Sequence, residues 1–169
     1  MDTRPIRFVH RGRIVGVEDA APTRSVLEWL REDARCTGTK EGCAEGDCGA
    51  CTVIVAELAG PGAASGAPAA MATVVGGLSL RPVNACIRFL PTLDGKALLS
   101  VEDLAAIGGG ELHPVQQAMV ECHGSQCGFC TPGFVMSLWA CYQQHQGAGT
   151  RPDRQALADT LSGNLCRCT

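Results

Sequence analysis

The sequence predicts an α+β chain in which a small mixed sheet folded over one helix precedes an all-α bundle. Short runs rich in β-branched residues dominate the first part, and only one stretch there has helical spacing. From Ser100 onward no strand pattern is convincing, and helix signals follow one another. The 169 residues are enough for two small domains, which we predict at residues 1–99 and 100–169.

The chain begins with a predicted hairpin followed by a helix. Two β-branched runs, over residues 6–10 and 13–18, are separated by the dipeptide Arg-Gly, which is typical of a tight turn. Residues 25–33 then change to helical spacing. A capping-box pattern from Ser25 to Glu28 marks the start of this helix.

The same sheet is expected to take two more strands. Residues 51–58 form a β-branched run, and residues 78–88 resume the pattern, although Pro82 indicates an edge position or a bulge there. Between them, residues 59–70 contain only alanine, glycine, proline and serine, so we predict a mobile surface loop. A small mixed sheet over a single helix is the β-grasp arrangement.

Four helices are predicted in the second part, each opened by a capping residue or by a proline in the first turn. Their starts are Ser100, with a capping box to Asp103, then Pro114, Thr131 and Pro152. The third helix is expected to turn four side chains inward: Phe134, Val135, Leu138 and Tyr142. Helices of this kind in sequence indicate a small helical bundle.

Composition limits the classes of partner and the compartment. The net charge of −3, the scarcity of aromatic residues and the lack of a basic run argue against nucleic acid. No apolar stretch is long enough to span a bilayer, and the segment before Val9 is charged where a signal peptide would be apolar. We therefore expect a cytoplasmic protein. In that reducing compartment, eleven cysteines, an odd number, indicate metal binding and not a disulfide scaffold.

The stretch from Glu41 to Cys51, EGCAEGDCGAC, carries the strongest chemical signal. Four residues separate Cys43 from Cys48 and two separate Cys48 from Cys51, which is the spacing of a plant-type ferredoxin loop around a 2Fe-2S cluster. The interleaved glycines allow positive φ and let amide N–H groups face the sulfurs. Cys86, in PVNACI, is the candidate fourth ligand. A structural zinc site is the alternative, but zinc motifs usually pair their cysteines in two knuckles.

A second set of cysteines lies in the helical part, as CxxC in QCGFCTPG and CxC in NLCRC: Cys127, Cys130, Cys166 and Cys168. This spacing is compatible with a metal site. A thioredoxin-like CxxC also precedes a helix, but it requires neighbouring strands and leaves the CxC pair unexplained. The three remaining cysteines are expected to pack as small apolar side chains: Cys36, Cys122 and Cys141.

No residues in this chain form a convincing catalytic group. The sequence contains no Rossmann fingerprint, P-loop or nucleophile arrangement, and no general acid or base stands out. The scattered histidines are expected at the surface or as helix caps: His10, His113, His123 and His145. Acidic residues beside the first cysteine set are expected to form a solvated face that would also lower the potential of a reducible centre: Glu41, Glu45 and Asp47. Bond-making is expected elsewhere.

Four motifs together resemble the iron-sulfur segment of the molybdenum hydroxylases, in family order: GTKEGCAEGDCGACTV, VNACIRFLP, GSQCGFCTPGF and GNLCRCT. This family includes xanthine dehydrogenase, aldehyde oxidase and the carbon monoxide dehydrogenase of aerobic bacteria, and the resemblance covers almost the whole chain. Within it, LHPVQQAM and LPTLDGKAL look most like bacterial xanthine dehydrogenase. The resemblance implies an N-terminal β-grasp ferredoxin-like domain followed by a small all-α helical-bundle 2Fe-2S domain.

The resemblance also implies which residues bind each cofactor. The first cluster would be held by Cys43, Cys48, Cys51 and Cys86. The second would be held by Cys127, Cys130, Cys166 and Cys168. Gln126 matches a glutamine that contacts the molybdopterin, and Cys168 stands where a ligand cysteine also reaches it. For Gln126 an ordinary loop hydrogen bond is the alternative.

The function implied by the resemblance is electron transfer. In such enzymes a molybdopterin centre hydroxylates the substrate, and electrons pass through the helical-domain cluster and the ferredoxin-like cluster to FAD. The chain would then be one part of a hetero-oligomer with a molybdopterin-binding large subunit and an FAD-binding subunit or domain, in xanthine or hypoxanthine oxidation. The alternatives are a small subunit of an aldehyde, carbon monoxide or N-heterocycle dehydrogenase, a free-standing ferredoxin-like carrier, and a zinc or iron-sensing module.

Two features depart from the family pattern. The gap from Cys51 to Cys86 is longer than in the family, with the glycine-alanine run as the insert, so the assignment of Cys86 rests on the VNAC match. The family continues past CRCT, whereas Thr169 is the last residue here, and chain ends fray. We expect either the leading part of a longer polypeptide or a small subunit whose tail a partner clamps.

Overall fold

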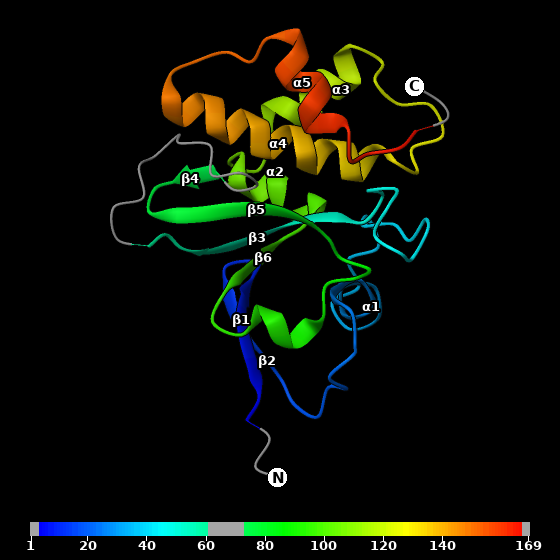
Figure 1. Ribbon diagram of the computed structural model, residues 1–169, viewed down its shortest axis with the longest axis vertical. Coiled ribbons are helices and arrows are strands. Elements are labelled where there is room, and N and C mark those ends of the chain that lie inside the picture. The colour runs from blue at the N-terminus through cyan, green and yellow to red at the C-terminus, as the bar shows by residue number, and fades with distance from the viewer. Residues whose placement is uncertain (1–3, 61–72, 167–169) are drawn as a thin grey trace.

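The computed structural model describes residues 4–60 and 73–166 of the chain, and these residues form a six-stranded mixed sheet with helices on both faces (Figure 1). The strands follow the order β2-β1-β6-β3-β5-β4 across the sheet. Their bounds are β1 Ile6–His10, β2 Arg13–Val17, β3 Thr52–Leu58, β4 Thr73–Val75, β5 Leu78–Asn84 and β6 Ala97–Leu99. The α-helices are α1 Val26–Glu32, α2 Leu104–Ile107, α3 Pro114–Glu121, α4 Thr131–Ala148 and α5 Arg154–Leu161. The predicted α+β class is confirmed. The predicted loop over residues 59–70 falls mostly outside the described residues.

The N-terminal hairpin forms as predicted. β1 and β2 pair antiparallel from Ile6 opposite Val17 to His10 opposite Arg13, and the two turn residues both take positive φ. That conformation suits the right-handed twist of a two-residue hairpin. On its other side β1 pairs parallel with β6, so the sheet is mixed as the β-grasp arrangement requires.

The predicted capping box at the start of α1 is present. The Ser25 hydroxyl oxygen accepts from the Glu28 amide at 3.1 Å, and the Glu28 carboxylate accepts from the Ser25 amide at 2.7 Å. Two of the unpaired N–H groups of the first turn are thereby satisfied. The apolar side of α1 packs on one face of the sheet, in a core that contains Phe8, Val26, Leu27, Leu30, Val53, Val55 and Leu98.

The central strand β3 is buried on both faces, and this explains how the helical part attaches. Side chains alternate along a strand. Val53 and Val55 therefore face α1, whereas Ile54 and Ala56 belong to a second core on the opposite face. That second core includes Met136 and other side chains of α4. Figure 1 shows α3, α4 and α5 stacked over this face of the sheet.

The third predicted helix is α4 in the structure, and the prediction of its inner face was only partly correct. Of its four predicted residues only Val135 is fully buried, and Phe134, Leu138 and Tyr142 are half-buried. The residues actually buried run around most of the helix: Gly133, Val135, Met136, Ser137, Trp139, Ala140 and Cys141. The reason is that α4 lies between the sheet and the helices α3 and α5, so it has no single inner stripe. By contrast, α5 buries no residue fully.

The strand predicted over residues 78–88 ends earlier, at Asn84. Pro82 pairs with Ile54 of β3, but β4 pairs only with residues 78–80 of β5, so the proline lies where that side of the strand is open. The edge position predicted for Pro82 is therefore confirmed locally. Cys86 lies in the turn after the strand, where the Ala85 amide donates to the Cys51 carbonyl oxygen at 3.1 Å.

Helical structure begins directly after the last strand. β6 ends at Leu99, and the capping box of Ser100 and Asp103 opens a short 3-10 turn that continues into α2. Among the residues described after Leu99 there is no strand, and none of their helices is both long and apolar enough for a bilayer crossing. Because this part shares a core with the sheet, the division into residues 1–99 and 100–169 stays a prediction.

Two predictions for single residues were wrong. Cys122 is exposed, although Cys36 and Cys141 are buried as expected. His10 is not at the surface: its ring is buried, its Nδ1 lies 3.3 Å from the Leu98 carbonyl oxygen, and its Nε2 lies 3.6 Å from the Cys36 sulfur. Its neighbour Trp29 covers the ring edge-on.

His113 caps α3, and its cap should depend on pH. Its Nδ1 accepts from the Val115 amide at 3.2 Å, so the cap requires the neutral ring, and burial lowers the pKa of His113 below 6.5. Stability from this cap is present above pH 6.5 and is lost as pH falls from that value through the lower pKa of the folded protein, because the unfolded chain takes up the proton first. His113→Asn keeps a capping side chain but does not titrate in this range. We expect its apparent unfolding temperature to fall less than that of the parent when the pH is lowered from about 7.5 to about 5.5. An equal loss in both proteins would contradict this assignment.

Candidate metal centres

The first candidate centre is built on the loop between α1 and β3. Within it the amides of Asp47 and Cys48 both approach the Cys43 sulfur at 3.4 Å. Ala44 and Gly46 take positive φ, which curls the backbone around that sulfur. The predicted arrangement of amide N–H groups facing a cysteine sulfur is therefore present for Cys43.

These amides favour the thiolate form of Cys43. Hydrogen bonds from the backbone amides of Cys48, Glu45 and Asp47 lower the pKa of Cys43 to about 6. The thiolate is the form that binds a metal. The loop thus holds one sulfur in its metal-binding form.

Cys51 and Cys86 form a pair of thiols at the base of the same loop. Their sulfurs lie 3.4 Å apart, with Cys51 buried and Cys86 half-buried. Burial, together with the neighbouring Cys51 thiol, raises the pKa of Cys86 to about 12. The pair comes together because β3 starts at Thr52, directly after Cys51, and the turn after β5 carries Cys86 back beside it.

A second pair of thiols lies in the helical part. The sulfurs of Cys130 and Cys166 lie 3.1 Å apart, and burial, followed by the Cys166 thiol, raises the pKa of Cys130 to about 11. Cys130 directly precedes α4 and makes no side-chain capping hydrogen bond, and Cys127 stands exposed three residues earlier in the same loop. Cys168 lies outside the described residues. Gln126 is exposed beside Cys127.

The described thiols stand in two pairs whose sulfur separations suit two ligands of one metal. No three His, Cys, Asp or Glu side chains within residues 4–60 and 73–166 converge to hold one metal ion. A 2Fe-2S cluster takes two protein ligands on each iron, so its ligands arrive as pairs. Two thiolates about 2.3 Å from one tetrahedral metal lie about 3.8 Å from each other. The pairs at 3.4 and 3.1 Å approach that separation and are far from disulfide bonding distance.

The two candidate centres touch through one backbone hydrogen bond. The amide of Leu165, next to Cys166, donates to the carbonyl oxygen of Cys48 at 2.9 Å. A residue of the first cysteine set is thereby joined to the neighbour of a residue of the second. This contact was not predicted from the sequence, because neither cysteine motif contains a signal that it contacts the other.

The helical part also holds the segment that leads into the first loop. The Glu102 carboxylate accepts from the Gly38 amide at 2.7 Å. From α1, the Arg31 guanidinium donates to the carbonyl oxygens of Thr37 and Thr39 at 3.1 and 2.8 Å. This segment is therefore fixed from two sides before the chain reaches Cys43.

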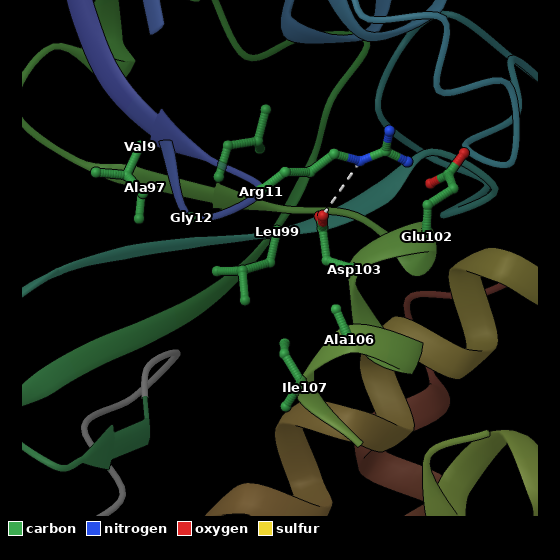
Figure 2. A pocket seen from close by; sticks show the side chains of 10 residues that line it. Val9, Arg11, Gly12, Ala97, Leu99, Glu102, Asp103, Ala106 and Ile107 are labelled. Atoms are coloured by element: carbon green, nitrogen blue, oxygen red, sulfur yellow. Dashed lines mark ion pairs between the residues drawn. The ribbon is translucent and has the colours of Figure 1, made fainter. Parts of the chain in front are cut away.

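A separate cavity lies between the hairpin and α2. It has a volume of about 550 Å³ and is lined mainly by apolar side chains of β1, β6 and α2. Figure 2 shows Arg11 reaching from the hairpin turn to Asp103, with an Nε to Oδ1 distance of 3.6 Å. No cysteine lines this cavity. Its Arg11–Asp103 ion pair joins the sheet to the helical part.

Family models match both parts of the chain. Residues 9–86 match the model of the 2Fe-2S iron-sulfur cluster binding domain, and residues 100–169 match that of the 2Fe-2S binding domain. These are the two segments that carry the two cysteine sets.

Similar proteins match the sequence over almost the whole length of the chain. Aldehyde oxidase 1 of Rattus norvegicus is 39% identical over 169 residues, 100% of this chain and 11% of that protein. Xanthine dehydrogenase of Blastobotrys adeninivorans is 37% identical over 167 residues, 99% of this chain and 11% of that protein. The chain thus spans about a tenth of the length of these relatives.

Solved structures share the fold. Aldehyde oxidoreductase from Desulfovibrio desulfuricans superposes with a TM-score of 0.75 at 27% identity, over 99% of this chain and 16% of that one. Quinoline 2-oxidoreductase from Pseudomonas putida 86 gives a TM-score of 0.72 at 29% identity, over 98% of this chain and 83% of the matched chain.

Proposed function

We propose that the chain is the iron-sulfur electron-transfer segment of a molybdenum hydroxylase, because residues 9–86 and 100–169 match two models of 2Fe-2S binding domains. In this role it carries electrons from a molybdopterin centre to FAD. The observation that supports it most is the direct hydrogen bond between Leu165 and Cys48, which joins the two cysteine sets. A chain that only stored iron or zinc would not need its two sites in contact.

Each part of the chain supplies its own ligands in this proposal. The first cluster is held by Cys43, Cys48, Cys51 and Cys86. The second is held by Cys127, Cys130, Cys166 and Cys168. When bound, each cluster accepts and releases an electron at a potential that hydrogen bonds to sulfur help to set. The amides of Asp47 and Cys48 supply such bonds at Cys43.

The surface around the second set is proposed to face the molybdopterin chain. Gln126 is exposed at the edge of the loop that carries Cys127, where its amide can meet an external group. We propose that Gln126 and Cys168 contact the pterin. The first set then faces an FAD-binding subunit or domain, in a cytoplasmic hetero-oligomer.

Xanthine or hypoxanthine is the proposed substrate of the assembly. LHPVQQAM and LPTLDGKAL support this choice by their likeness to bacterial xanthine dehydrogenase. Xanthine dehydrogenase is the name of one relative, whereas others are named aldehyde oxidase and one solved relative is a quinoline oxidoreductase. Oxidation of an aldehyde or N-heterocycle is therefore the second candidate.

Purification from the native source tests the proposal. We expect the chain to carry the visible absorption of iron-sulfur clusters and to remain with a molybdopterin-binding chain or domain through successive columns. Xanthine, added without air, should then bleach that absorption. A colourless zinc protein would refute the cluster assignment, and a coloured protein without molybdopterin would leave only the free-standing carrier. Bleaching by an aldehyde but not by xanthine would select the second candidate.

A further inference from the structure

A buried polar cluster lies between the two ligand segments, namely the first ligand loop, which carries Cys48 and Cys51, and the second ligand segment, which leads from α5 to Cys166. It consists of Thr52 at the start of β3, Ser137 in α4 and Asn164 in the segment after α5. All three are nearly excluded from solvent, with exposed fractions of 6%, 6% and 8%. Buried polar groups are costly unless paired, so the partners of each one matter.

Asn164 is paired in three directions. Its side-chain amide nitrogen donates to the Gly49 carbonyl oxygen at 3.0 Å and lies 3.3 Å from the Thr52 hydroxyl. Its side-chain oxygen accepts from the Ser137 hydroxyl at 2.6 Å. One side chain thus ties the first ligand loop, helix α4 and the second ligand segment together.

Two glycines let these elements approach closely. Gly49 takes a φ of +70°, and a Cβ there would overlap with the Gly163 carbonyl oxygen and stand 2.6 Å from the Asn164 amide nitrogen. A Cβ on Gly133 of α4 would overlap with the Gly49 carbonyl oxygen. The contact between the two ligand segments therefore leaves no space for a side chain at either position.

The next residue after Asn164 makes the backbone contact between the cysteine sets. The Leu165 amide donates to the Cys48 carbonyl oxygen, although Leu165 itself is 56% exposed. Cys166 follows directly. The position of this short segment over the first loop is therefore held by its neighbour Asn164 and not by apolar packing of Leu165.

We propose that Asn164 is a positioning residue that fixes the separation of the two clusters, by locking the segment before Cys166 onto the loop between Cys48 and Cys51. This inference rests on the proposed function, because it requires a cluster in each part. Electron transfer and magnetic interaction both weaken as centres move apart. Asn164 would therefore control the exchange of electrons between the clusters without binding either.

The test compares three variants in the protein isolated with its partner chains. Asn164→Ala removes all three interactions, and Ser137→Ala removes only the bond that orients the Asn164 side chain. Asn84→Ala is the matched control: its side-chain amide also donates to a carbonyl of the first loop, that of Gly46, but from the same part of the chain. Two quantities are measured, namely hydrogen exchange of the peptide containing the Leu165 amide and the magnetic splitting of the EPR signals with both clusters reduced.

We expect Asn164→Ala to retain both EPR signals, to exchange the Leu165 amide about tenfold faster and to lose part of the splitting. Ser137→Ala should give smaller changes in the same direction, and Asn84→Ala should leave the splitting unchanged. If Asn164→Ala cannot hold the second cluster, Ser137→Ala decides alone. Unchanged splitting in both, or equal loss in Asn84→Ala, would overturn the inference. Failure of the parent protein to show two signals would instead overturn the proposed function.

Discussion

Cys48→Ser is expected to abolish one of two EPR signals and to leave the signal of the helical part intact. Cys48 belongs to the loop whose amides surround the Cys43 sulfur, and the pair of Cys130 and Cys166 lies in the other part of the chain. Because each part has its own thiols, loss of one ligand should empty one site only. The iron content should fall by about half, since the proposal gives each 2Fe-2S cluster its own four cysteines.

Cys122→Ser is the control for this experiment. Cys122 is exposed, follows α3 directly and belongs to neither cysteine set. Both signals and the full iron content should persist in that variant. Loss of both signals in Cys48→Ser, with Cys122→Ser unaffected, would contradict the division of ligands between the two parts.

Gly133→Ala is expected to destabilise the protein, although alanine is normally the better residue within a helix. Gly133 lies in the first turn of α4, where the exchange would ordinarily stabilise by up to about 1 kcal/mol. Here the added Cβ would overlap with the Gly49 carbonyl oxygen and stand 3.2 Å from the Ala50 Cα. Overpacking of this kind costs about 1 to 3 kcal/mol. We expect the apparent unfolding temperature to fall by about 2 to 12 °C, and the first cluster to be lost sooner on warming.

Gly147→Ala in the same helix is the matched control. A Cβ at Gly147 would meet only the Val75 side chain, at an ordinary 3.8 Å. This exchange should raise the apparent unfolding temperature by about 2 to 4 °C. Stabilisation in both variants would show that α4 does not press against the first ligand loop.

Local patterns in the sequence predicted local structure well. Both capping boxes, at Ser25 and at Ser100, are formed, because each depends on residues only three positions apart. The hairpin turn at Arg11 and Gly12 is likewise set by two adjacent residues. The predicted approach of loop amides to the Cys43 sulfur is likewise present, because it depends on residues only a few positions apart.

Long-range packing was much less predictable. The short strands β4 and β6 form by pairing with the longer strands β5 and β3. Segments of three residues carry almost no periodic signal of their own. The burial of α4 on several sides follows from elements far away in the chain, which its own pattern cannot reveal.

Asn164 and Gly133 show the same limit within the candidate site. Both stand inside motifs that were noted for their cysteines, so their presence was visible but their role was not. Their contacts with Gly49 join residues more than eighty positions apart. One signal was available: a polar residue two positions before Cys166 and a glycine directly after a helix-opening proline are both unusual where only a ligand loop is needed.

Iron and acid-labile sulfide per chain test the central claim most directly. Eight cysteines divided between two sites predict about four irons and four sulfides per chain after anaerobic reconstitution. A value of about two of each, or none, would contradict the account, because one part of the chain would then lack the centre on which electron transfer through it depends.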